Sequence, residues 1–468
     1  MRPAGLYVLA LAIQLVWMQT VRQPFDWDSA SYRAVALHLL HGDGAVTGAL
    51  WNLLVKPPLP MPADLYWMPL PSRILVPALA LGMQGDQMLN AALGALLAPL
   101  AWGLMRVRAP ERPSLALAAG ILAATGGMYA RFLVSADSVA LFGVLGAAGF
   151  LATAKKQAAL AAFCAVLAAW TRNDGFLLGL AFGLGLWAES RSARALAPVL
   201  GGLGTWLVWQ LRNASLVEDW WSTRATLANI LELSQLIRGT APAVNLGERL
   251  RFAMHSLPPT AAMVGLLVLP FPAIFRMGGG GWMRGVQAYA LGLPVAGYLL
   301  APAVFAEGSF FRSSVALYAV ACGLAVEGWA GLQTSRYHPA FLPTLAGFGV
   351  LGLQYAVGGS PRPAAFTIAD CAPLQQLPEK TIVFSNHPPL VEALCGRPSV
   401  ILPAGLEPGE VTVLATRYQI PAALIAGQTG PGGAPDPGQY LPGWIFRGGL
   451  WWAPTSQPVP TTRSPSTP

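Results

Sequence analysis

The first polar segment of the chain, residues 25–44, places two carboxylates where chemistry is possible. Asp26 and Asp28 follow the first apolar stretch and directly precede apolar side chains at helical spacing. We expect a short amphipathic helix there, lying along a membrane surface. Its polar face consists of Arg33, His38 and His41. A carboxylate fixed at this point meets both lipid headgroups and water. The alternative is structural: Asp28 caps the helix and Gly42 ends it.

Further charged residues lie where apolar stretches end. Asp137 follows the third predicted span, and Arg172 and Asp174 lie in the turn between two short apolar windows. Because a charged turn recessed into a membrane is costly without a partner, we expect this turn to lie near the first polar segment. The other interpretation is a mutual ion pair between Arg172 and Asp174 that has only a structural role.

The first polar segment continues into a loop rich in proline and aromatic residues. Tyr66 and Trp67 are residue types favoured at the level of lipid headgroups, so we expect a binding loop at that depth. Lys56 and Arg73 are candidates to contact a lipid phosphate. The default interpretation of a single interfacial cation is that its stem lies along apolar surface while its charge reaches water.

The composition indicates a polytopic membrane protein. Of the 468 residues, 54% are hydrophobic and only 11% are charged, against about a quarter charged in soluble domains. We predict about eleven transmembrane helices, from windows without charged residues at 3–21, 87–105, 113–130, 138–154, 157–171, 175–188, 195–211, 256–275, 285–306, 313–326 and 339–361. Window 3–21 has no small-residue cleavage site at its end, so we expect a retained span.

The loop charges predict an orientation. With a cytoplasmic N-terminus, most basic residues of the short loops lie inside, as the positive-inside rule requires. Asp26, Asp28 and the chain beyond the last span then lie outside. The net charge of +8 is largely accounted for by the inner loops, and no cluster of basic and aromatic residues indicates a nucleic-acid partner.

The composition changes at about residue 362. We divide the chain into a membrane module (1–361), an α/β domain with a mainly parallel sheet on the outer side (362–453) and a low-complexity tail expected to be disordered (454–468). The α/β domain contains no phosphate-binding glycine motif. It contains Cys371 and Cys395, whose spacing alone does not establish a disulfide.

Several motifs, in this order, resemble the GT-C superfamily of glycosyltransferases that use polyprenyl-phosphate sugars, the group of protein O-mannosyltransferases and aminoarabinose transferases. They are Asp28-x-x-x-Tyr32, YWMPLPS at 66–72, Asp137, TRNDG at 171–175, a large outer loop after seven spans, FFRSS around Arg312, and the outer tail with NHPP and GRPSVILP. Many relatives carry an Asp-Glu pair at the first-loop site. Here Ser29 follows Asp28, which leaves Asp26 or Asp137 as the second acid.

The resemblance implies transfer of a sugar from a polyprenyl phosphate to a hydroxyl group of an extracytoplasmic glycan, lipid or protein, with inversion at the anomeric carbon. Phosphate is a good leaving group, so one carboxylate base suffices, and Asp28 takes that role with Asp26 and Asp137 as further catalytic candidates. The candidate substrate-binding residues are Tyr32, Lys56, Tyr66, Trp67, Arg73, Arg172, Asp174 and Arg312. Lys56, Arg172 and Arg312 are the candidates to stabilise charge on the departing phosphate.

The resemblance assigns no cofactor. Residues 26–28 match a D-x-D motif by letter, so a divalent metal is only weakly indicated, and no glycine-rich cradle indicates a nucleotide sugar. We expect an integral protein of a bacterial plasma membrane. Two alternatives stay open: a transporter or flippase, which would tend to show internal repeats and midplane charges, and a non-catalytic scaffold with the same fold.

Overall fold

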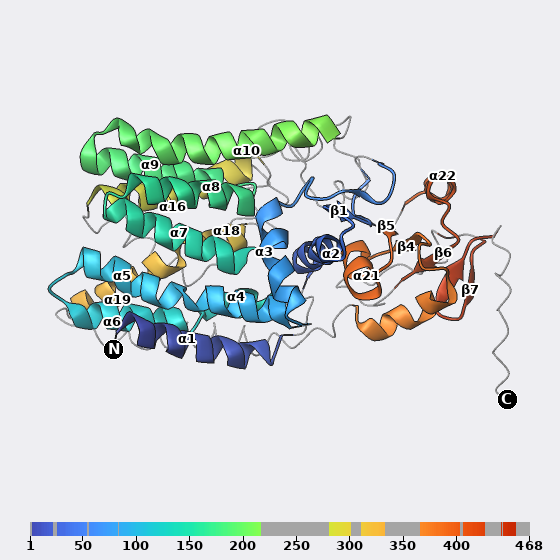
Figure 1. The fold of residues 1–468 in the computed structure, drawn as a ribbon, viewed down its shortest axis with the longest axis horizontal. Helices are drawn as coiled ribbons and strands as arrows, with labels where there is room; N and C mark the ends of the chain where they lie inside the picture. The colour runs from blue at the N-terminus through green and yellow to red at the C-terminus, as the bar shows by residue number, and fades with distance from the viewer. Residues whose placement is uncertain are drawn as a thin grey trace.

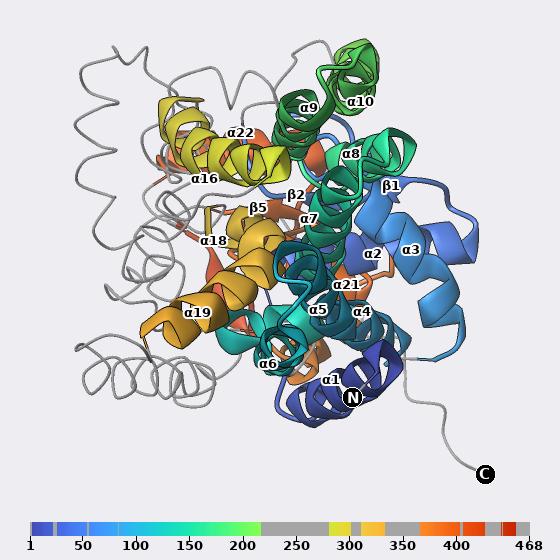
Figure 2. The same ribbon diagram turned by 90° about the vertical axis from the view of Figure 1, so that its left-hand side faces the viewer.

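Most helices of the protein lie side by side in one elongated bundle (Figure 1). The computed structural model describes residues 2–21, 26–53, 56–82, 84–216, 280–300, 310–332, 366–402, 406–425, 441 and 443–454. The bundle contains α1 (Pro3–Met18), α4 (Gly85–Ala95), α5 (Leu97–Arg108), α6 (Pro113–Ala124), α7 (Val139–Ala154), α8 (Ala158–Thr171), α9 (Phe176–Ser190), α10 (Leu196–Leu216), α16 (Gly281–Leu300), α18 (Phe310–Ser314) and α19 (Tyr318–Leu332). Seen nearly end-on, α7 lies between α5 and α8 and packs against both (Figure 2).

The predicted apolar windows form helices wherever the structure describes them. Windows 256–275 and 339–361, and most of the large outer loop, lie outside the described residues. Within the described part, two helical stretches are long and apolar enough to cross a membrane, Gly85–Arg108 and Phe310–Gly328, and several shorter apolar helices accompany them. The number of about eleven spans and their sidedness therefore stay predictions.

The bundle core is built from large apolar side chains packed onto small residues. Phe142 and Phe150 of α7, Phe182 of α9 and Tyr289 of α16 are fully buried. The ring of Phe182 lies directly over Gly149, where an added Cβ would come within 2.1 Å of that ring. Glycine therefore permits the close approach of α7 and α9 that continuous core packing requires.

The C-terminal domain contains a six-stranded sheet with strand order β2-β5-β4-β6-β8-β7. Its strands are β2 (Ala49–Leu50), β4 (Val383–Ser385), β5 (Ser399–Ile401), β6 (Ala422–Leu424), β7 (Ile445–Arg447) and β8 (Leu450–Trp452). Strands β2, β5, β4 and β6 are parallel to one another, and β7 and β8 add an antiparallel edge. Helices α21 (Pro388–Cys395) and α22 (Pro408–Tyr418) alternate with the strands, as predicted.

One strand of this sheet comes from the first polar loop. Strand β2 pairs with β5 in parallel, with Ala49 opposite Ser399 and Leu50 opposite Val400. The same loop also forms a small ribbon of β1 (Val46–Thr47) and β3 (Met61–Pro62). The first loop is therefore part of the C-terminal domain in space, although more than 300 residues separate the two in sequence.

Helices α2 (Trp27–His41) and α3 (Pro69–Ala80) lie between the bundle and the sheet (Figure 1). Helix α2 packs against α3, α21 and β1. This packing differs from the expected helix lying along a membrane surface. The assignment of Arg33 to an exposed polar face is wrong: its side chain is buried and pairs with the buried carboxylate of Asp86 on α4. A buried guanidinium requires such a partner, and periodicity alone could not identify one on another helix.

Candidate active site

Three carboxylates converge on one guanidinium at the end of the bundle that faces the sheet. Arg312 of α18 places Nη2 2.5 Å from Asp26 Oδ2, Nη1 3.4 Å from Asp28 Oδ2 and Nε 3.0 Å from Asp137 Oδ2. Asp26 and Asp28 come from the start of α2, and Asp137 lies just before α7. The structure therefore brings together four predicted site residues from three segments that lie far apart in sequence.

The helix cap is Asp26, and the interpretation of Asp28 as the cap is wrong. Asp26 has an extended backbone, its Oδ1 accepts from the backbone N–H of Ser29 at 2.9 Å, and its own N–H donates to Ser29 Oγ at 2.9 Å. This reciprocal pair is a capping box. Asp28 is the second residue of the helix, so its carboxylate has no capping role. Gly42 ends the helix in the left-handed conformation, as predicted.

Of the three carboxylates, Asp28 is held least closely by Arg312. Its Oδ1 accepts from Trp67 Nε1 at 3.0 Å, and its Oδ2 lies at the longest of the three distances from Arg312. Asp26 divides its oxygens between the helix cap and Arg312. The side chains of Asp28 and Asp26 are 24% and 23% exposed, whereas that of Asp137 is fully buried. Asp28 therefore has the geometry of a carboxylate that a substrate hydroxyl can reach.

Asp137 is held from both sides. Its Oδ1 accepts from the backbone N–H and the hydroxyl of Ser138, and its Oδ2 accepts from Arg312 Nε. Burial raises the pKa of Asp137 to about 6, and the guanidinium of Arg312 opposes that rise. With both oxygens occupied, Asp137 is suited to fixing the orientation of Arg312.

A second arginine lies beside this cluster. Arg172, in the turn between α8 and α9, pairs with Asp174 at 3.0 Å and donates to Ser313 Oγ at 3.0 Å and to Ser138 Oγ at 3.4 Å. The ion pair with Asp174 that the sequence suggested is therefore present. The serine contacts join the turn to Asp137 and Arg312, because Ser138 and Ser313 follow those residues directly.

The aromatic candidates form the wall next to Asp28. Trp67 contacts its carboxylate, and the Trp67 ring lies 5.2 Å from that of Tyr66 and 5.3 Å from that of Trp51. Asn173 donates to the Tyr66 carbonyl at 2.7 Å, which links this wall to the Arg172 turn. Tyr32 is buried at the cluster, and burial raises its pKa well above the usual value.

Two predicted phosphate contacts lie apart from the central cluster. Arg73 pairs with the buried carboxylate of Asp64, a residue that the sequence analysis missed. Burial raises the pKa of Asp64, and Arg73 opposes that rise. Lys56 is exposed, and its backbone carbonyl accepts from Arg417 of α22. Among the described residues, no ion pair joins the Lys56 side chain to Asp26, Asp28 or Asp137, the three carboxylates that contact Arg312.

Other residues that the sequence analysis missed are the partners of the predicted ones. Ser138 and Ser313 had a visible signal, because each adjoins a charged candidate in its motif. His387 and Glu392, which contact α2 from the C-terminal domain, had none beyond the NHPP segment.

The D-x-D letters of residues 26–28 do not form a set of metal ligands in this arrangement. Trp27 turns to His387 of the C-terminal domain, and Arg312 lies where the carboxylates of Asp26 and Asp28 converge. Across the described ranges, no group of three or more histidine, cysteine, aspartate or glutamate side chains is arranged to hold a metal ion.

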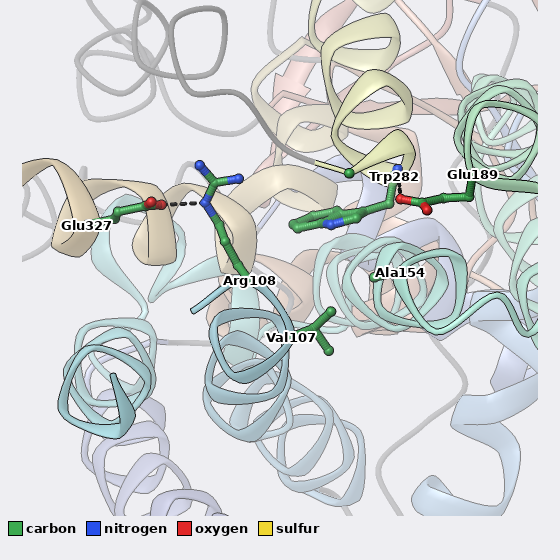
Figure 3. Close-up of a pocket in the computed structure, with 7 residues that line it drawn as sticks. Val107, Arg108, Ala154, Glu189, Trp282 and Glu327 are labelled. Carbon is green, nitrogen blue, oxygen red and sulfur yellow. Dashed lines mark hydrogen bonds and ion pairs between the residues drawn. The ribbon is translucent and has the colours of Figure 1, made fainter. Parts of the chain in front are cut away.

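A cavity of about 310 Å³ lies at the opposite end of the bundle (Figure 3). Arg108 pairs there with Glu327, and Glu189 accepts from the backbone N–H of Trp282 at 3.2 Å. Each carboxylate of this cavity has a partner within the wall, and no predicted site residue lines it. We therefore place the candidate active site at the Arg312 end.

Comparisons with known proteins identify the fold. No protein-family model matches the sequence, and a search of curated proteins finds no significant match. Solved structures do match. ArnT from Cupriavidus metallidurans, bound to undecaprenyl phosphate, is 13% identical with a TM-score of 0.53, and the match covers 96% of this chain and 97% of that chain.

Two structures of the Archaeoglobus fulgidus oligosaccharyltransferase match as well. One, AglB in complex with an inhibitory peptide and a dolichol-phosphate, has 10% identity and a TM-score of 0.51 over 90% of this chain and 69% of that chain. The other, tethered with an acceptor peptide, has 11% identity and a TM-score of 0.53 over 90% and 68%. This oligosaccharyltransferase and ArnT are both members of the GT-C superfamily. This chain therefore has the fold of the GT-C glycosyltransferases.

Proposed function

We propose that this protein is an integral-membrane glycosyltransferase. It moves a sugar from a polyprenyl-phosphate carrier to a hydroxyl group of an extracytoplasmic glycan, lipid or protein, with inversion at the anomeric carbon. The observation that carries the proposal is the convergence of Asp26, Asp28 and Asp137 on Arg312 at one end of a GT-C fold. The lipid phosphates bound by ArnT and AglB support the choice of carrier.

Asp28 acts as the general base. Its carboxylate takes the proton of the acceptor hydroxyl while that oxygen bonds to the anomeric carbon of the donor. The bond from this carbon to the phosphate oxygen breaks, and the lipid phosphate leaves with the electron pair. The Trp67 indole holds Asp28 Oδ1 at 3.0 Å, which leaves the partly exposed carboxylate oriented toward the acceptor. A positioned base of this kind contributes about 10²- to 10⁴-fold to the rate.

Arg312 and Arg172 stabilise the charge on the departing phosphate. Both guanidinium groups are already oriented by carboxylates and serine hydroxyls, so little reorganisation is needed when charge develops. Asp137 holds Arg312, and Asp174 holds Arg172. Both arginines lie at one end of the bundle, where a lipid-linked phosphate at the membrane surface would meet them.

The donor class is tested with purified protein. It is incubated with a panel of sugars carried on polyprenyl phosphate and with the corresponding nucleotide sugars, and release of free lipid phosphate is followed. We expect release from one lipid-linked sugar and no transfer from nucleotide sugars. Transfer from a nucleotide sugar without lipid carrier would overturn the proposal.

The proposed orientation places the N-terminus in the cytoplasm and the Asp28 end, with the sheet domain, outside. Single cysteines at exposed positions test it: His41→Cys of α2, Val413→Cys of α22 and Lys155→Cys at the opposite end of the bundle. In intact cells, a membrane-impermeant thiol reagent should label the first two and spare the third. The reverse pattern would contradict the orientation and the extracytoplasmic acceptor.

A further inference from the structure

One helix of the C-terminal domain contacts both ends of α2. His387 directly precedes α21, and its Nδ1 accepts from the indole N–H of Trp27 at 3.2 Å. Trp27 is the first residue of α2 and lies between Asp26 and Asp28 in sequence. The two rings meet edge to face, with centroids 6.1 Å apart. The start of the helix that carries both carboxylates is therefore bound to the sheet domain.

The hydrogen bond from Trp27 defines the protonation state of His387. An indole N–H can only donate, so His387 Nδ1 must accept, which requires a neutral ring with its proton on Nε2. Burial lowers the pKa of His387 and so favours that neutral form. The Phe366 ring packs against the imidazole with centroids 6.4 Å apart and helps to exclude water.

The other end of α2 is bound by Glu392. This carboxylate is 5% exposed and accepts from His38 Nε2 at 3.0 Å, from Thr47 Oγ1 at 2.7 Å and from the backbone N–H of Gly48. A Cβ at Gly48 would lie 3.0 Å from Pro398 and 3.2 Å from Glu392 Oε1, so the approach depends on glycine. Glu392 thus joins the last turns of α2 to the loop that enters the sheet.

Helix α21 is itself firmly held. Its last residue, Cys395, forms a disulfide with Cys371. Its first residue, Pro388, accepts through its carbonyl from Ser399 Oγ of β5 at 3.1 Å. The contacts to α2 therefore come from a rigid element. Arg312, by contrast, belongs to the helical bundle, so Asp26 and Asp28 and their guanidinium partner are supplied by different parts of the molecule.

We propose that His387 and Glu392 are positioning residues, which fix α2 at both ends and thereby set Asp26 and Asp28 against Arg312. The C-terminal domain thereby takes part in catalysis by positioning the start of α2. The inference rests on the proposed function, because it explains how the carboxylates of that reaction are placed. It extends that function by assigning a role to two residues and to the domain that contains them.

The test uses full-length purified protein with three substitutions. His387→Leu removes the acceptor for Trp27, His387→Asn returns an acceptor oxygen close to the position of Nδ1, and Trp452→Phe serves as the matched control. Trp452 also donates an indole hydrogen bond, at 3.1 Å to the Arg447 carbonyl, but lies on β8 away from α2. Release of lipid phosphate gives kcat and KM, and hydrogen exchange follows the amides of Ser29 and Ala30 at the helix cap.

We expect His387→Leu to lower kcat by about 10- to 100-fold with little change in KM, because the base is displaced while the donor site persists. Its Ser29 and Ala30 amides should exchange faster than those of wild type. His387→Asn should recover most of both properties, and Trp452→Phe should match wild type. Equal behaviour of His387→Leu and Trp452→Phe would overturn the inference. If wild-type protein used no lipid-linked donor, the proposed function would fail, and the exchange rates would still decide the positioning role.

Discussion

The two ends of the helical bundle both hold buried charges, but they arrange them differently. At the far end Arg108 pairs with the carboxylate of Glu327. At the end facing the sheet, Arg312 is shared by three carboxylates, and Arg172 and Asp174 lie beside it. One guanidinium cannot neutralise three carboxylates, and crowded like charges are unfavourable when buried. Such an excess is typical of sites that do chemistry, whereas a matched pair is typical of structural support.

The comparison predicts its largest effect for removal of the shared arginine. Arg312→Gln leaves three carboxylates without a cation, so we expect turnover to fall by about 10²- to 10³-fold. Stability should fall by about 3–5 kcal/mol, the range for breaking a buried ion pair by removing one partner. Turnover and thermal unfolding of the purified variant measure both effects.

The matched control is Arg108→Gln at the far end, which removes the cation that pairs with the partly exposed Glu327. We expect a smaller loss of stability and wild-type turnover. A variant at Arg108 that lost as much turnover as the one at Arg312 would remove the distinction between the two ends.

A smaller effect separates the roles of Asp26 and Asp28. Asp26→Ala removes the cap of α2, so its stability should lie about 0.5–2 kcal/mol below that of Asp26→Asn, which keeps a capping oxygen. The corresponding pair at position 28, Asp28→Ala and Asp28→Asn, should show no such difference. Thermal unfolding of the four variants under one condition makes the comparison. Equal differences at both positions would contradict the assignment of Asp26 as the cap.

The smallest effect is a pH dependence of stability that arises at the C-terminal end of α2. The hydrogen bond from His38 to Glu392 raises the pKa of His38 from 6.5 to about 9. Because the folded-state pKa lies above the unfolded value, the stabilisation is fully present below about 6.5 and is lost as pH rises through about 9. Wild type should therefore exceed His38→Gln in thermal midpoint at pH 6, with the advantage fading by pH 10. His41→Gln, an exposed histidine three residues on, is the control and should follow wild type at every pH.

The sequence predicted those features that depend on local pattern. Within the described residues, apolar windows without charge became helices, Gly42 ended α2, and strand-helix alternation beyond residue 362 gave a mainly parallel sheet. Helical periodicity and turn chemistry act over a few residues, so they can be read directly. The cap was misassigned because two acidic residues stand two positions apart, and only the backbone conformation of Asp26 distinguishes them.

Features that depend on distant partners could not be predicted. Arg312 lies 286 residues from Asp26, and nothing local indicates that the two meet. Arg33 was assigned to a polar face because its partner, Asp86, lies on another helix. Strand β2 has two residues, too few for a periodic signal, and it joins the sheet only because β5 offers a free edge.

The central claim, that the carboxylate of Asp28 is the base of a sugar transfer from a lipid phosphate, is tested most directly by Asp28→Asn. The substitution removes the charge, leaves the Asp26 cap in place and retains an oxygen that can accept from Trp67. Turnover is measured by release of lipid phosphate from the donor that wild type uses, with Glu327→Gln as the control at the other end of the bundle. We expect Asp28→Asn to lose about 10²- to 10⁴-fold in kcat with unchanged thermal stability, and Glu327→Gln to turn over as wild type does. Near-normal turnover by Asp28→Asn would contradict the account.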